Sequence, residues 1–214
     1  MQKKPPTQAE RALALLQQRG MIRTSEFSNA GIAATTLSRL KEAGAIVQIA
    51  RGLYELPDTG FDANRAFAEI AKIAPRSVIC LTSALAFHDL TDQIPSRVFV
   101  AIGRKDRQPK LSSSRFQFVH FSDAQLRPGV QHHIIHQVPV QIFSPAKTII
   151  DLFRYAQGTG ARYRHSPGLS VALEGMREAL RTRKTTPSEI AHYATEEGIW
   201  KSVAPYLEAM TANA

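Results

Sequence analysis

The chain has 214 residues, with 27 Lys and Arg against 18 Asp and Glu and a formal net charge of +9. Hydrophobic residues make up 43% and charged residues 21%, the balance of a folded globular protein. Apolar runs fall short of the roughly 18–20 residues of a membrane span, and the single Cys80 excludes an intramolecular disulfide and a cysteine-based zinc cluster. No signal peptide is evident. We therefore expect a cytoplasmic protein without metal or cofactor, whose charge predicts an anionic partner, most economically nucleic acid.

The first sixty residues alternate helix signals with glycine breaks. Thr7 and Glu10 have the spacing of a capping box, and apolar residues at helical spacing follow until Gly20. A short second helix is predicted after Thr24, with Phe27 buried. A third helix is predicted over residues 33–43, with Leu37 and Leu40 buried, followed by two short strands at 46–50 and 53–56.

This order of three helices and a hairpin is typical of a winged helix-turn-helix, so residues 1–58 are predicted to form a DNA-binding domain. The third helix would enter the major groove, and the hairpin tip would reach a phosphate or the minor groove. A small helical module that only packs on the rest of the chain is the alternative. The predicted DNA-binding residues are Thr35, Thr36, Ser38, Arg39, Lys41 and Arg51.

Residues 59–214 predict a mixed α/β domain with a helical C-terminal tail, so the fold class of the whole chain is α+β. Pro57 and Gly60 are typical of a short connection between domains. Helices are expected over 61–74, 84–90 and 146–155, and three more should start near 166, 186 and 198. Strands are expected at 78–81, 98–102 and 116–121, with a hairpin of 131–138 and 140–143 around Pro139.

A second basic region lies at residues 103–115, which hold five cations and one acid. Its proline and three consecutive serines predict a mobile, solvated loop, and solubility alone is one explanation of its charge. The other is an auxiliary contact to phosphates or to an acidic patch on a protein partner. The residues concerned are Arg104, Lys105, Arg107 and Lys110.

Several stretches together resemble the AbiEi family, the antitoxins of type IV toxin–antitoxin, or abortive-infection, systems. They are 31–40, 51–54, 79–85 with His88, and 143–151, in this order within residues 7–185. Many relatives have arginine where this chain has Lys147, and the tail after Arg183 has no match. The resemblance implies a winged helix that binds inverted repeats in its own promoter as an autorepressor. It also implies a C-terminal domain, 59–214, that counteracts a nucleotidyltransferase toxin in phage defence.

The sequence gives less support to a catalytic or a metal-binding function than to a DNA-binding antitoxin. His132 and His136 would share one face of a strand while His133 points away, and no acid or cysteine completes a metal site. Cys80 falls in an apolar strand, which argues against a nucleophile paired with His88, and that histidine is expected to be hydrogen-bonded in the core. No Asp-x-Lys or Glu-x-Lys follows residue 60, as a typical nuclease would need, and no Walker or dinucleotide glycine motif is present. We therefore expect no enzymatic activity.

A one-component transcriptional regulator whose C-terminal domain binds a small effector stays open as an alternative. An adjoining nucleotidyltransferase gene would favour the antitoxin, whereas an adjoining metabolic operon would favour the regulator. If the two-domain division is right, a fragment 61–214 should fold, lose operator binding and still rescue growth from the toxin.

Overall fold

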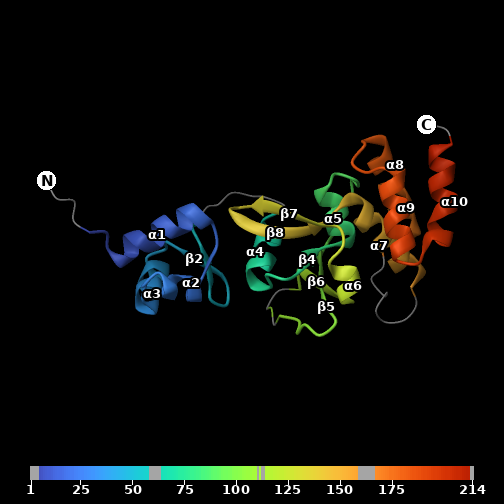
Figure 1. Ribbon diagram of the computed structural model, residues 1–214. Helices are drawn as coiled ribbons and strands as arrows, with labels where there is room; N and C mark the ends of the chain where they lie inside the picture. Colours follow the sequence, from blue (N-terminus) through green and yellow to red (C-terminus); the bar gives the residue numbers. More distant parts are fainter. Residues whose placement is uncertain (1–4, 58–63, 110, 112–113, 159–166, 213–214) are drawn as a thin grey trace. The chain divides into compact units, whose positions relative to one another are not determined.

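The computed structural model describes residues 5–57, 64–109, 111, 114–158 and 167–212. It shows a mixed α+β protein, which confirms the predicted fold class at this level (Figure 1). By compactness the chain divides into two units, Met1–Pro75 with His133–Val140, and Arg76–His132 with Gln141–Ala214. Among the described residues, no helix is long and apolar enough to cross a membrane.

In the continuous part of the first unit, up to Pro75, the described residues form four helices and three strands. They are α1 (Gln8–Arg19), β1 (Ile22–Arg23), α2 (Thr24–Asn29), α3 (Ala34–Glu42), β2 (Val47–Ala50), β3 (Leu53–Glu55) and α4 (Arg65–Ile73). The rest of the chain contains β4 (Val78–Ile79), α5 (Leu81–Phe87), β5 (Val98–Gly103), β6 (Phe116–Phe121), α6 (Asp123–Leu126), β7 (Val130–Ile135), β8 (Val138–Phe143), α7 (Pro145–Gln157), α8 (Leu169–Arg181), α9 (Pro187–Glu196) and α10 (Trp200–Thr211).

The three helices predicted at the N-terminus are confirmed within a residue or so at each end. Thr7 caps α1: its hydroxyl accepts from the Glu10 amide at 3.2 Å, while the Glu10 carboxylate accepts from the Thr7 amide at 2.7 Å. This satisfies two of the amides that a helix start leaves unpaired. Phe27 is fully buried in the core of this unit, together with the α1 and α3 residues Leu16 and Leu37.

A three-stranded antiparallel sheet, in the order β1-β3-β2, follows the helices. The hairpin of β2 and β3 was predicted, but β1 was not, because two residues are too few to show strand alternation. Between β2 and β3 the chain turns at Gly52, whose φ of +67° favours glycine. The carbonyl of Gly52 accepts from the amide of Thr24 at 2.8 Å, so this turn is tied to the start of α2.

Helix α4 is held to α2 by polar contacts within the first unit. The guanidinium of Arg23 donates to the carbonyls of Lys72 and Ile73 at 2.6 and 2.8 Å, and thereby satisfies carbonyls at the C-terminus of α4. The ammonium of Lys72 lies 3.0 Å from the carboxylate of Glu26. The first compact unit therefore extends past residue 58, where the sequence predicts a domain boundary; the functional boundary itself stays a prediction.

A five-stranded sheet has the order β6-β5-β4-β8-β7. Strands β6, β5 and β4 and the end of β8 belong to the second unit, whereas His133–Val140 of the β7–β8 hairpin belong to the first. Strands β5 and β6 are parallel, as are β4 and β8, whereas β4 and β5 are antiparallel. Helix α7 is buried along most of its length and contributes Ile149, Leu152 and Phe153 to a core that also takes side chains from α5, α8, α9 and α10. Its predicted start is confirmed: the Ser144 hydroxyl accepts from the Lys147 amide, and Pro145 is the first helical residue.

Three local predictions for this part of the chain were wrong or incomplete. Helix α5 begins at Leu81 rather than 84. Leu81 itself has φ of +50°, and the chain turns at this residue directly from β4 into the helix. The hairpin turn lies at His136 and Gln137, with φ of +48° and +58°, and not at Pro139, which lies within β8. Two consecutive residues with a positive φ form the type of turn that matches the right-handed twist of the two strands. Proline cannot take this place in the turn, because its ring fixes φ at a negative value. The short helix α6 was missed.

Candidate nucleic-acid interface

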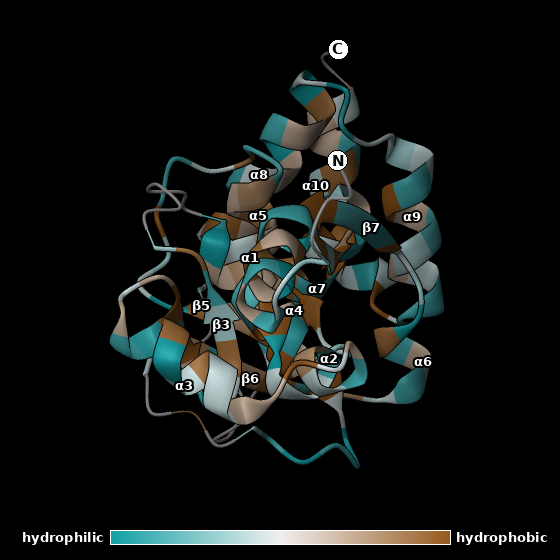
Figure 2. Cartoon of the chain, turned by 90° about the vertical axis from the view of Figure 1, so that its left-hand side faces the viewer, coloured by the Kyte–Doolittle hydropathy of each residue, from teal (hydrophilic) through white to brown (hydrophobic). Residues whose placement is uncertain are grey.

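Helix α3 presents a polar face on the side opposite its core contacts. Leu37 and Leu40 are buried at helical spacing, so the positions between them point away from the core. The helix shows both hydrophilic and hydrophobic residues in Figure 2. Four of the five predicted contact residues on this helix are exposed: Thr35, Ser38, Arg39 and Lys41.

The start of α3 is held by a side chain of α1. The residue before the helix, Ala33, has no side chain that could cap it. The Gln8 side-chain oxygen instead accepts from the Ala33 amide and from the Thr36 hydroxyl, both at 3.0 Å. Thr36 is consequently half-buried and already engaged within the protein, unlike the other predicted residues of α3. The sequence offered no signal for Gln8, because its partners lie 25 and 28 residues further along the chain.

The hairpin of β2 and β3 carries Arg51 at its turn, and this side chain is exposed. The ammonium of Lys41 lies 3.4 Å from the amide oxygen of Gln48, a contact between the end of α3 and β2. Among the described residues, the side chains of Arg39 and Arg51 make no hydrogen bond or ion pair. Both guanidinium groups are therefore available for an anionic partner, and a guanidinium can contact either a phosphate or a guanine edge.

The second basic region begins with a well-defined turn. Asp106 accepts from the Gly103 amide at 3.2 Å, pairs with Arg76 at 2.6 Å and donates its own amide to the Gly103 carbonyl. Arg104, Lys105 and Arg107 surround Asp106 with exposed side chains. Lys110 lies outside the described residues. The three described cations can reach solvent without disturbing the turn.

A buried charge cluster lies on α7, the helix that Ser144 caps, and not at the surface. The Lys147 ammonium lies 2.6 Å from Asp151 and 3.1 Å from Glu197, and Arg154 contacts the same two carboxylates at 3.2 and 2.5 Å. Burial raises the pKa of the Asp151 carboxyl, against the opposing effect of Lys147 and Arg154. The ammonium also lies 4.8 Å from the ring centre of Phe143. These four charges join α7 to the end of α9.

The other chemistry-bearing residues singled out in the sequence are Cys80, His88 and the histidines near the β7–β8 hairpin. Cys80 is fully buried, and burial, with the Asp151 carboxylate nearby, raises the pKa of its thiol well above the ordinary value. His88 is within 2.8 Å of the Phe143 carbonyl, which confirms its predicted hydrogen bond. His132 is exposed on β7, and in the described part of the chain no group of three His, Cys, Asp or Glu residues could hold a metal ion.

Comparison with known proteins connects the α3 face to a class of protein. Residues 10–57, which contain nearly all of α1 and everything up to the end of β3, match a family model described as "Transcriptional regulator, AbiEi antitoxin". The match gives the class first: this segment is similar to antitoxin-type transcriptional regulators. The model is that of the AbiEi family, and the resemblance seen in the sequence is thus confirmed over residues 10–57.

The remaining comparisons concern the fold. No curated protein shows a significant match to the chain. Among solved structures, the chain is similar to the crystal structure of RV2827C protein from Mycobacterium tuberculosis, with 11% sequence identity and a TM-score of 0.58. The similarity covers 99% of this chain and 83% of that chain. At this identity the likeness is one of fold alone.

Proposed function

We propose that the first sixty residues form a winged helix-turn-helix that binds double-stranded DNA, at inverted repeats in the protein's own promoter. Helix α3 would lie in the major groove, with Arg39 reading a base edge, and Arg51 on the hairpin would contact a phosphate or the minor groove. The protein would then act in the cytoplasm as an autorepressor and not as an enzyme.

The observation that carries this proposal is the exposed polar face of α3 beside an exposed cationic hairpin turn, within the segment that matches the AbiEi regulator model. Residues 1–58 carry eight Lys and Arg against five acids, which favours a polyanionic partner. Thr35, Ser38 and Lys41 are proposed as further contacts on the same face. Thr36 is proposed to contribute through its bond to Gln8, which holds the helix start.

DNA binding by the full chain to a promoter duplex tests this assignment. Arg39→Ala should weaken specific binding by ~1–3 kcal/mol, because a base-edge contact is lost. Arg51→Ala should weaken specific and scrambled duplexes alike, and should reduce the slope of log K against log salt by about 0.9 if one phosphate contact is lost. Lys201→Ala, which removes an exposed cation of α10, is the control for net charge. Parent-like affinity and salt slope in both arginine variants would contradict the proposal.

We further propose that residues 59–214 form the antitoxin domain, which counteracts a nucleotidyltransferase toxin. The AbiEi match of the N-terminal segment supports this. Arg104, Lys105, Arg107 and Lys110 are proposed as auxiliary basic contacts. Simultaneous substitution of these four by Gln should leave DNA affinity and toxin neutralisation unchanged if they serve solubility alone.

A further inference from the structure

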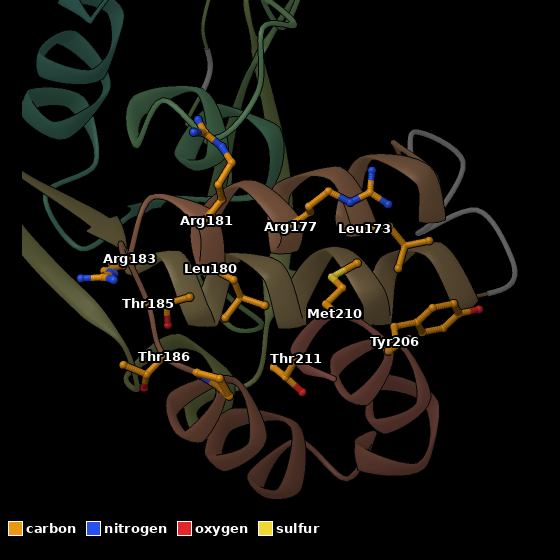
Figure 3. Close-up of a pocket in the computed structure, with 12 residues that line it drawn as sticks. Leu173, Arg177, Leu180, Arg181, Arg183, Thr185, Thr186, Tyr206, Met210 and Thr211 are labelled. Atoms are coloured by element: carbon orange, nitrogen blue, oxygen red, sulfur yellow. The ribbon is translucent and has the colours of Figure 1, made fainter. Parts of the chain in front are cut away.

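A cavity of about 830 Å³ lies in the C-terminal helices of the second unit. Helix α8 lies along one side and α10 along the other, and the segment that leads from α8 into α9 closes one end (Figure 3). Apolar side chains from both helices line it: Leu173 and Leu180 from α8, and Tyr206 and Met210 from α10. Its volume lies within the ~300–1,000 Å³ typical of small-molecule sites.

The apolar lining is only partly covered by the protein itself. Leu173, Leu180 and Met210 pack on the core with one side and are half-buried, and Tyr206 is 36% exposed. Transfer of such surface from water to an apolar ligand is favourable, in proportion to the apolar area covered. The cavity therefore favours a ligand with an apolar body.

The rim of the cavity is cationic. Arg181 is engaged by Glu178 at 2.6 and 2.9 Å. Arg177 and Arg183 are exposed, and their side chains make no hydrogen bond or ion pair among the described residues. Arg183 lies at the closed end and Arg177 on the long side formed by α8 (Figure 3). The acid nearest in sequence to the closed end, Glu189, already accepts from the Thr185 hydroxyl and the Thr186 amide. Two guanidinium groups at the rim of this apolar cavity thus have no partner in the part of the chain that the structure describes.

We propose that this cavity binds a small amphipathic carboxylate, an acyl or aryl carboxylic acid in its ionised form. The apolar body would lie against Leu173, Leu180 and Met210, and the carboxylate would take a bidentate hydrogen bond from Arg177 or Arg183. Closure of one end by the segment before α9 favours a compact ligand over a docked protein helix, which needs an open groove. This site is independent of the DNA-binding face proposed above.

Titration of the full chain with decanoate, and with decanol as the uncharged equivalent, tests the proposal. Decanoate should bind saturably and about tenfold or more tightly than decanol, because only decanoate can use the arginines. Arg177→Gln combined with Arg183→Gln should lower decanoate affinity to that of decanol. Lys201→Gln, an exposed cation of α10 that does not line the cavity, should change neither affinity.

The position of the ligand is tested by filling the cavity. Ala209→Trp should abolish decanoate binding, and Leu173→Trp, from the opposite helix, serves if the first variant does not fold as judged by circular dichroism. Decanoate binding unchanged in a folded Trp variant would overturn the site. Absence of saturable binding to the parent, or equal affinities for decanoate and decanol, would overturn the ligand class. Self-association through these helices that decanoate does not reverse would point instead to a second copy of the chain, and would also overturn it.

Discussion

At the scale of single residues, Gln8 holds α3 in place without lying on it. One side-chain oxygen accepts both the Ala33 amide and the Thr36 hydroxyl at 3.0 Å. It satisfies the Ala33 amide, one of the amides that a helix start leaves unpaired, at a helix whose N-cap residue has no side-chain acceptor. Gln8 is therefore a positioning residue for the proposed DNA-contacting helix.

Gln8→Ala should lower the free energy of unfolding by about 1 kcal/mol, as the loss of a cap does, and should also weaken promoter binding because the start of α3 is no longer held. Urea unfolding and a DNA-binding titration of the same samples measure the two effects. Gln17→Ala, an exposed residue of the same helix, is the matched control and should change neither. Weaker DNA binding in the control as well would show that α1 contacts DNA in its own right.

The buried ammonium of Lys147 forms ion pairs with two carboxylates, those of Asp151 and Glu197. Its side chain and that of Asp151 are both fully buried at a separation of 2.6 Å. Lys147→Met should destabilise the protein by up to about 3–5 kcal/mol, because the buried Asp151 carboxylate loses the nearer of its two cationic partners and keeps only Arg154. The combined change Lys147→Met and Asp151→Leu should be less harmful than the single one, since no unpaired charge is left. Urea denaturation of the full chain measures both.

The pH dependence of the Lys147→Met variant supplies a second readout. Burial already raises the pKa of Asp151, and removal of Lys147 would raise it further. A carboxyl whose pKa is higher in the folded state is stabilising when protonated, so the deficit of the variant should shrink as the pH falls. A deficit that grows in acid would contradict this account of the cluster.

At the scale of elements, α2 and α4 are joined by Glu26 and Lys72. Partial burial raises the pKa of the Glu26 carboxyl, but hydrogen bonds from the Arg23 amide and the Lys72 ammonium outweigh it, so that the pKa is lowered overall. A carboxyl with a lowered pKa stabilises the fold above its ordinary pKa, and this stabilisation is lost as the pH falls through the folded-state value. The contact between α2 and α4 should therefore weaken in acid.

Glu26→Gln should lower the free energy of unfolding at neutral pH and have a smaller effect at about pH 3, where the parent carboxyl is itself being protonated. Unfolding curves of parent and variant at the two pH values test this directly. Glu42→Gln, an exposed carboxylate at the end of α3, is the control and should show no comparable difference. An effect of Glu26→Gln that stays constant between the two pH values would rule out the ionised contact as its source.

At the scale of the whole molecule, the division into two activities is the main prediction. A fragment 61–214 lacks α1 to β3 and should lose promoter binding, yet it should still rescue growth when the neighbouring toxin is expressed. Its α4 loses Glu26, Arg23 and the ion pair between Glu55 and Arg65, so the fragment should unfold at a lower temperature than the full chain. Growth rescue and thermal circular dichroism measure the two properties.

A second fragment, 76–214, is the matched control for this experiment. It also removes α4, so rescue by both fragments would place antitoxin action within residues 76–214. A folded 61–214 fragment without rescue would contradict the proposed division. A metabolic operon next to the gene, in place of a nucleotidyltransferase gene, would favour the alternative of an effector-binding regulator. The cavity between α8 and α10 would then be the candidate site for the effector.

The sequence by itself determined the elements whose signals are local. The caps of α1, α7 and α9 each join residues three apart, so Thr7, Ser144 and Thr186 could be identified without any tertiary information. The same holds for the buried Leu37 and for the exposure of Arg39, because helical periodicity alone separates the two faces of α3.

Only the tertiary structure decided the features that join distant parts of the chain. The bond from Gln8 to Thr36 spans 28 residues, and the contact of Arg23 with the Lys72 carbonyl spans 49. The pairing of β1 with β3 and the cavity between α8 and α10 likewise exist only once separate elements meet. No periodicity or spacing encodes such pairings, because each depends on where packing of the whole core brings two unrelated segments together.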